Sequence, residues 1–106
     1  MYIKKAKIVR VITPGLYEAV IQLGFGIVLE RTVRLKDLPE SLKSSIEVKD
    51  FIKSRIAYHD ILLMEEKGKD YQGNPLVTIF YGCNKRNLAQ EIKTMKFGKE
   101  IDNDER

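Results

Sequence analysis

Hydrophobic and polar residues alternate along three segments in the first third of the chain, a pattern typical of β-strands with one buried face. The segments cover Ile3–Ile12, Leu16–Leu23 and Ile27–Leu35, and they are separated by Thr13-Pro14-Gly15 and Gly24-Phe25-Gly26. Proline and glycine favour tight reversals of the backbone, so the separators predict turns between neighbouring strands. In the third segment Arg34 falls on the side opposite Val33 and Leu35, and we expect it to point away from the core.

A helical period replaces the alternation in the middle of the chain. Apolar residues at helical spacing are Val48, Phe51, Ile52 and Ile56. Ser44 and Glu47 fit a capping box, which marks a helix start. The pattern predicts a helix from about Ser45 to Arg55.

The last third contains two further strand patterns and a second helix. The apolar run Ile61–Met64 is followed by a charged segment that we expect to end the strand, and Gln72-Gly73-Asn74-Pro75 predicts a turn before a strand over Leu76–Tyr81. Asn87 and Gln90 can cap a terminal helix, with Gly98 as its stop. The order is therefore three strands, a helix, two strands and a helix.

This order predicts a mainly β fold with α-helices. We expect a five-stranded OB-fold-like Greek-key barrel with one helix between strands 3 and 4 and a C-terminal helix. Such a barrel leaves the face of its second and third strands, with the adjoining loops, available for oligonucleotides or oligosaccharides.

The length and composition of the chain predict one small domain. The chain has 106 residues, 43% of them hydrophobic, which is enough for a core and too short for a multidomain enzyme. The net charge is +4, but four acids and one base lie in the last seven residues. We expect a mildly basic domain over residues 1–99 and an acidic, flexible tail over 100–106. A basic surface is compatible with phosphate-bearing ligands and equally with simple solubility.

The sequence argues against several classes of protein. The longest uncharged apolar stretch, Ala19–Leu29, is shorter than the ~20 residues of a membrane-spanning helix. No secretory signal is visible, and we expect a cytoplasmic protein without a membrane partner, of bacterial or phage origin. One cysteine and one histidine cannot build a zinc cluster or an internal disulfide, and we expect Cys83 to be a partly buried structural residue.

Six short segments carry a resemblance to a known family. The sharpest is the box Asp37-Leu38-Pro39-Glu40 between the third strand and the first helix. The others are Val9-Arg10-Val11-Ile12, Leu23-Gly24-Phe25-Gly26-Ile27, the strand end Val33-Arg34-Leu35, the turn Asp70-Tyr71-Gln72-Gly73-Asn74-Pro75-Leu76 and the helix start Asn87-Leu88-Ala89-Gln90-Glu91-Ile92. In this order they resemble the staphylococcal nuclease (thermonuclease) family, with similarity from about Lys7 to Gly98.

The resemblance implies a calcium-dependent phosphodiesterase site. In this family aspartates bind the cation, a glutamate activates water and two arginines stabilise the phosphate. Position by position, it assigns Arg34 as the first arginine, Asp37 as a metal-binding aspartate and Glu40 as the general base. Carboxylate oxygens suit a hard cation, and guanidinium groups match phosphate oxygens.

Other parts of that site are missing from the sequence. Gly15 and Thr13 stand where the family carries two aspartates, and Asn74 stands where it carries the second arginine. An uncharged amide cannot replace a guanidinium on a phosphoryl transition state. The interval from Arg34 to Asp37 is also shorter than is usual in the family, which would re-aim Glu40. Glu18 or Glu30 would have to lie near Asp37 to restore a metal site.

We therefore expect a catalytically degenerate nuclease-like domain that binds single-stranded DNA or RNA and requires no cofactor. Candidate contacts are Arg31, Arg34, Lys36, Lys67 and Lys69, with Tyr71 or Tyr81 as a stacking platform. For Tyr81, close to a strand end, a place in the core is the favoured interpretation. Two alternatives stay open: an active Ca²⁺-dependent nuclease that uses Arg34, Asp37 and Glu40, and an adaptor that binds a protein partner.

Overall fold

The computed structural model describes residues 3–42, 45–57 and 59–94. Within these residues the chain forms strands, two α-helices and a short 3-10 helix. Their bounds are β1 Ile3–Thr13, β2 Leu16–Gly24, β3 Ile27–Leu35, η1 Glu40–Leu42, α1 Ile46–Ile56, β4 Asp60–Lys69, β5 Pro75–Tyr81, β6 Arg86–Asn87 and α2 Leu88–Thr94.

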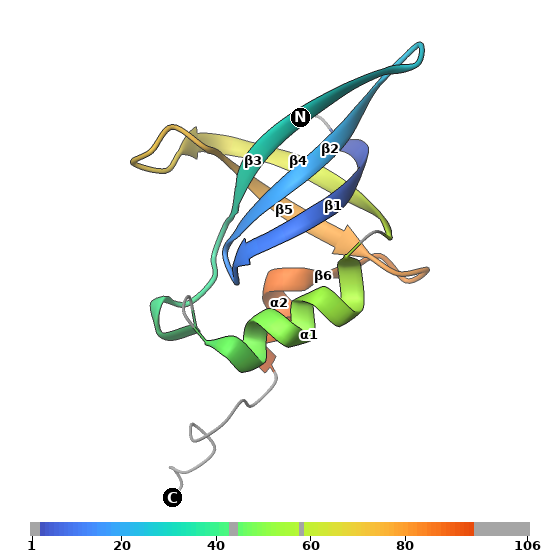
Figure 1. Cartoon of the computed structure of the whole chain (residues 1–106). Coiled ribbons are helices and arrows are strands. Elements are labelled where there is room, and N and C mark those ends of the chain that lie inside the picture. Colours follow the sequence, from blue (N-terminus) through green and yellow to red (C-terminus); the bar gives the residue numbers. More distant parts are fainter. Residues whose placement is uncertain (1–2, 43–44, 58, 95–106) are drawn as a thin grey trace, which may run out of the picture.

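Five of the strands close into a barrel (Figure 1). The order β3-β2-β1-β4-β5 is antiparallel throughout, and a parallel pairing of β3 with β5 joins the two ends of the sheet. We call this parallel junction the seam. It consists of the pairs Arg34–Leu76 and Leu35–Val77. The structure confirms the predicted fold: a closed five-stranded barrel of OB-like topology, with one helix between β3 and β4 and a second near the C-terminus.

A β-bulge explains the imperfect alternation of β1. The pairing with β2 shifts register between Ile8 and Arg10, so Val9 is an extra residue. Ile8 and Val11 both point into the core, three residues apart instead of two. The bend lets β1 pair with β2 along one edge and with β4 along the other.

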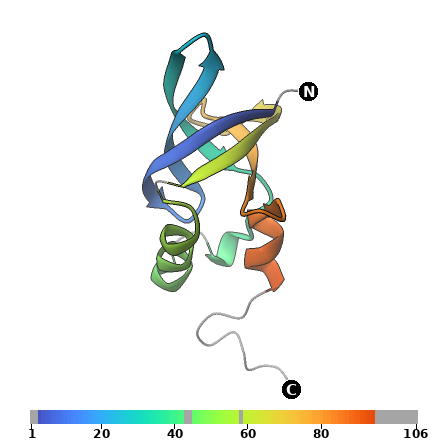
Figure 2. The same ribbon diagram turned by 90° about the vertical axis from the view of Figure 1, so that its right-hand side faces the viewer.

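The two helices cover one end of the barrel, opposite the projecting β2–β3 hairpin (Figures 1 and 2). Helix α1 buries Val48, Ile52 and Ile56. Its N-cap is Ser45, whose hydroxyl accepts a hydrogen bond from the Val48 backbone N–H. The predicted capping box at Ser44 is therefore wrong by one residue, while the predicted helix is confirmed.

Helix α2 covers the same end of the barrel with Leu88, Ala89 and Ile92. The Asn87 side chain accepts a hydrogen bond from the Gln90 backbone N–H, as expected for a cap. The predicted stop at Gly98 and the predicted tail over 100–106 lie outside the described residues.

Strand β4 is longer than its apolar run predicts. It continues through the charged residues to Lys69, paired with β5, and forms an arm beyond the barrel. Polar residues are tolerated there because most side chains of the arm reach solvent. The expectation that the charged segment ends the strand is wrong for this reason.

Two expectations about single residues are also settled. Cys83 is exposed in the turn after β5, so its prediction as a partly buried residue is wrong. Tyr81 is buried and donates its hydroxyl hydrogen bond to Glu91. This confirms a core position for Tyr81 and removes it as a stacking platform.

Candidate functional site

A cleft of about 340 Å³ lies beside the seam, between the turn after β3 and the turn of the β4–β5 arm. We call it the seam cleft. It is lined by Arg34, Leu35, Lys36, Asp37, Leu38, Asp70, Tyr71 and Leu76. Four residues singled out from the sequence, Arg34, Lys36, Asp37 and Tyr71, therefore line one cleft.

Arg34 is held in the cleft by Asp70. Its Nε donates to Asp70 Oδ2 at 2.9 Å, and the two side chains are only 17% and 8% exposed. Among the described residues no partner forms a hydrogen bond or an ion pair with the two terminal nitrogens of the guanidinium. The anchor thus leaves the two ends of the guanidinium fork for an anionic ligand.

Asp70 also organises the turn that carries Tyr71. Its carboxylate accepts hydrogen bonds from the backbone N–H groups of Gln72 and Asn74 and from the Asn74 side chain, at 2.8 to 3.0 Å. Burial acts to raise the pKa of Asp70, but the N–H donors of Asn74, Arg34 and Gln72 outweigh it and bring the pKa to about 2. Asp70 is therefore a stable anion at neutral pH.

Asp70 is a site residue that sequence reasoning missed, although it begins the turn motif. Its signal is an aspartate placed before a Gly-Asn-Pro turn, where its side chain can accept from backbone N–H groups further along. The same network gives Asn74 a role. Its backbone N–H and its side chain both donate to the Asp70 carboxylate and so tie the turn to Asp70.

Asp37 lies in the turn after β3 with a left-handed backbone, φ 70°, and is exposed. Glu40 begins η1, but its side chain lies outside what the structure describes. No group of three or more potential metal-binding side chains occurs among the described residues. The assignments of Asp37 to metal binding and of Glu40 to catalysis remain predictions from the sequence.

Gly15 lies directly against Arg34. A Cβ atom at Gly15 would stand 3.8 Å from Arg34 Nη1 and 3.3 Å from Leu38 Cδ2. The Gly15 carbonyl also accepts a 2.8 Å hydrogen bond from the Leu35 backbone N–H. The position at which the family resemblance expects an aspartate is thus close to Arg34, and the space beside it is filled by Leu38.

The lysines of the proposed surface are placed on β4 and just after β3. Lys36 Nζ lies 3.5 Å from Glu66 Oε1, and Lys67 and Lys69 are exposed on the arm. A hydrogen bond from the Thr78 hydroxyl lowers the pKa of Glu66 against the opposing effect of burial, and Lys36 lowers it further. Lys69 pairs with Pro75, one residue before the seam pair Leu76–Arg34, so the arm leads directly into the cleft.

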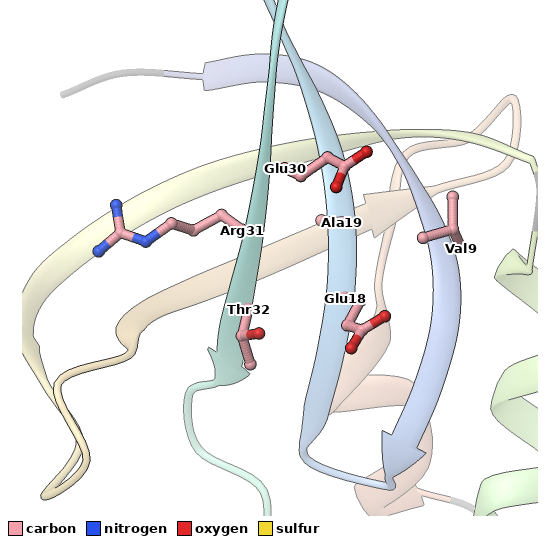
Figure 3. A pocket seen from close by; sticks show the side chains of 6 residues that line it. All are labelled: Val9, Glu18, Ala19, Glu30, Arg31 and Thr32. Atoms are coloured by element: carbon pink, nitrogen blue, oxygen red, sulfur yellow. The ribbon is translucent and has the colours of Figure 1, made fainter.

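Arg31 does not join this group. Alternation along β3 places it on the face opposite Arg34. Arg31 lines a separate hollow of about 290 Å³ together with Glu18 and Glu30, although Figure 3 shows its side chain extending away from the two carboxylates. Arg31 thus lies outside the seam cleft that Arg34 lines, and its assignment as a nucleic-acid contact stays a prediction.

Glu18 and Glu30 line that hollow, whereas Asp37 lines the seam cleft. Glu18 is paired with Arg10 at 3.3 Å. The structure therefore does not place either glutamate with Asp37 as a replacement metal ligand.

Chemically, the seam cleft combines an anchored guanidinium with an aromatic side chain that is 90% exposed, that of Tyr71. These groups can bind a phosphate and offer a stacking surface for a base. No helix among the described residues is long and apolar enough to cross a bilayer. Comparison with known proteins gives no matching family model and no matching curated protein.

Proposed function

We propose that the seam cleft binds single-stranded nucleic acid and that the chain is a catalytically degenerate, staphylococcal nuclease-like binding module. The observation that carries the proposal is the pairing of Arg34 with Asp70. Asp70 fixes Arg34 through Nε alone, so the terminal nitrogens remain for a phosphate oxygen.

Tyr71 supports a nucleic-acid ligand over a free phosphate ion. Its side chain is exposed next to Asp70, on a turn held rigid by that carboxylate. An exposed aromatic ring beside a phosphate-binding arginine suits a nucleotide, whose base stacks while its phosphate is held. Lys67 and Lys69 extend the positive charge along the arm.

Binding without cleavage follows from the residues that replace the family's catalytic groups. Asn74 brings no second positive charge, and Gly15 brings no carboxylate. Loss of one transition-state donor alone typically costs about 10²- to 10³-fold in rate.

The proposal is tested by fluorescence anisotropy with labelled single-stranded DNA and RNA. We expect binding that weakens as salt rises, because lysine and arginine contacts release counterions from the phosphates. Tyr71→Ala should weaken binding about 10- to 100-fold, as expected for one stacked base. Arg34→Lys should also weaken it, since lysine keeps the charge but not the fork.

Lys69→Ala should also weaken binding, because it removes a positive charge from the arm. Lys53→Ala is its matched control. Lys53 is an exposed lysine on α1, at the helical end of the barrel. Equal effects of the two substitutions would refute a site at the arm. Cleavage of the same oligonucleotides with Ca²⁺, blocked by EDTA and by Glu40→Gln, would replace the binding module with the active nuclease.

A further inference from the structure

The β2–β3 hairpin projects from the barrel (Figures 1 and 2), and its tip is apolar. From Val20 to Leu29 there is no charged side chain. Its exposed large hydrophobic residues are Leu23, Phe25, Ile27, Val28 and Leu29. An apolar patch of this kind on a small domain marks an interaction site.

Phe25 occupies an unfavourable position in the monomer. Gly24 pairs with Ile27, so Phe25 and Gly26 form a two-residue turn with φ 56° and 75°. Such type I′ turns favour Asn and Gly, because bulky side chains are strained at positive φ. The Phe25 side chain is also 103% exposed. Neither property stabilises the isolated domain.

The backbone of the same segment is an open edge. Strand β3 pairs with β2 along its length, but on its other side only Arg34 and Leu35 pair with β5. In the described part of the chain, residues 27–33 have no second strand. Their outward N–H and C=O groups form a template for another β-strand.

The open edge and the apolar side chains together select the kind of partner. A lipid surface could accept the side chains, but it cannot satisfy an open sheet edge. A nucleic acid would gain nothing electrostatic from an uncharged segment. A protein strand satisfies both the backbone and the side chains.

We propose that the partner is a second copy of this chain, with β3 paired antiparallel to β3 about a two-fold axis at Leu29. An axis at Glu30 or Arg31 would place two like charges directly opposite each other, which destabilises a strand pair. The axis at Leu29 pairs Leu29 with its counterpart, Val28 with Glu30 and Ile27 with Arg31. No like charges are then directly opposite.

The length of the open edge also fits this register. Five pairs cover Ile27–Arg31, and the turn of the second copy then reaches Thr32 and Val33, just before the seam. A cleft of about 320 Å³ lies there, lined mainly by apolar residues that include Leu29, Val33, Leu63 and Pro75. Phe25 of the second copy fills this cleft, which explains an exposed aromatic residue in a strained turn.

The oligomeric state of the full chain tests the proposal. Sedimentation velocity from micromolar to millimolar concentration should show a dimer that forms reversibly. Phe25→Asn and Leu29→Lys should each raise the dissociation constant about thirtyfold or more, as expected for central interface residues. Phe25→Asn should leave the melting temperature of the monomer unchanged or higher, because Asn accepts positive φ.

Ile46→Lys is the matched control, since Ile46 is an exposed apolar residue at the start of α1. A chain that stays monomeric at every concentration would overturn the proposal, as would a dimer equally weakened by Ile46→Lys. Binding of the monomer to phosphatidylcholine vesicles, abolished by Phe25→Asn, would overturn it in favour of a lipid surface.

Single-cysteine variants in a Cys83→Ser background test the register. Leu29→Cys places two thiols directly opposite each other, so oxidation should give a disulfide-linked dimer. Glu30→Cys places them on a diagonal, about 7 to 8 Å apart, and should cross-link poorly. Preferential cross-linking of Glu30→Cys would overturn the proposed pairing.

Discussion

Replacing Asp70 by Asn tests the physical basis of the seam cleft. The Asp70 carboxylate accepts from Arg34, Gln72 and Asn74, and its pKa lies near 2 against an ordinary value of 3.8. One pKa unit corresponds to about 1.4 kcal/mol, so the ionised carboxylate stabilises the folded state by about 2 kcal/mol. We expect Asp70→Asn to lower the free energy of unfolding by about this amount at neutral pH.

The direction of the pKa shift determines how the contribution of Asp70 to stability changes with pH. The folded-state pKa is lowered, so the contribution is fully present well above 3.8, is lost as the pH falls through about 2, and is absent below that value, where Asp70 is protonated in both states. Urea denaturation followed by circular dichroism at several pH values measures it. The free energies of unfolding of the wild type and Asp70→Asn should differ at neutral pH, approach each other at about pH 2 and converge below it.

Asp60→Asn is the control for the loss of a carboxylate charge. Asp60 begins β4, the strand that ends one residue before Asp70; it is well exposed and stands 3.8 Å from Lys7. A surface pair of this kind contributes about 0 to 1 kcal/mol. The reasoning is refuted if Asp60→Asn destabilises as much as Asp70→Asn, or if the effect of Asp70→Asn is independent of pH.

Two further substitutions test the core. Ile52→Ala on α1 removes a fully buried side chain and should cost about 2 to 5 kcal/mol by urea denaturation, whereas Ile46→Ala at the exposed start of that helix should cost far less; equal losses would contradict the assigned faces. Tyr17→Phe removes the hydroxyl that donates to the Pro14 carbonyl and should cost about 1 to 3 kcal/mol. Burial raises the pKa of Tyr17 above the ordinary range, so its phenol should stay neutral in an alkaline absorbance titration of the folded protein; ionisation of Tyr17 in the folded protein at the ordinary tyrosine pKa of about 10 would contradict its burial.

The fold was predictable because β2 and β3 carry a period of two, β4 begins with an apolar run, turn signals separate the strands and α1 carries a helical period. The departures have local causes. The bulge at Val9 breaks the alternation of β1, and the charged end of β4 lies in an arm that no core covers. Hydrophobic patterning predicts which strand residues are buried. It gives no signal for the part of a strand that extends beyond the barrel into solvent.

The candidate site was predictable only in part. The sequence indicated Arg34, Lys36 and Tyr71, but the partner of Arg34 lies 36 residues away, at Asp70. The pairing of Arg34 with Asp70 depends on how β3 packs beside β5, and the spacing of residues along the sequence does not indicate it. Arg31 was expected beside Arg34, but residues three apart along a strand point to opposite faces of the sheet.

The seam joins β3 to β5 through two residue pairs and the hydrogen bond from the Lys36 backbone N–H to the Val77 carbonyl. So short a junction should open more readily than the long antiparallel ladders, and the amide hydrogen of Lys36, which bonds to Val77, should exchange with deuterium earlier than those of β1 and β2. A ligand held by Arg34 and Lys36 would stabilise the closed junction. Slower deuterium uptake at the Lys36 amide would then report occupancy without any label on the ligand.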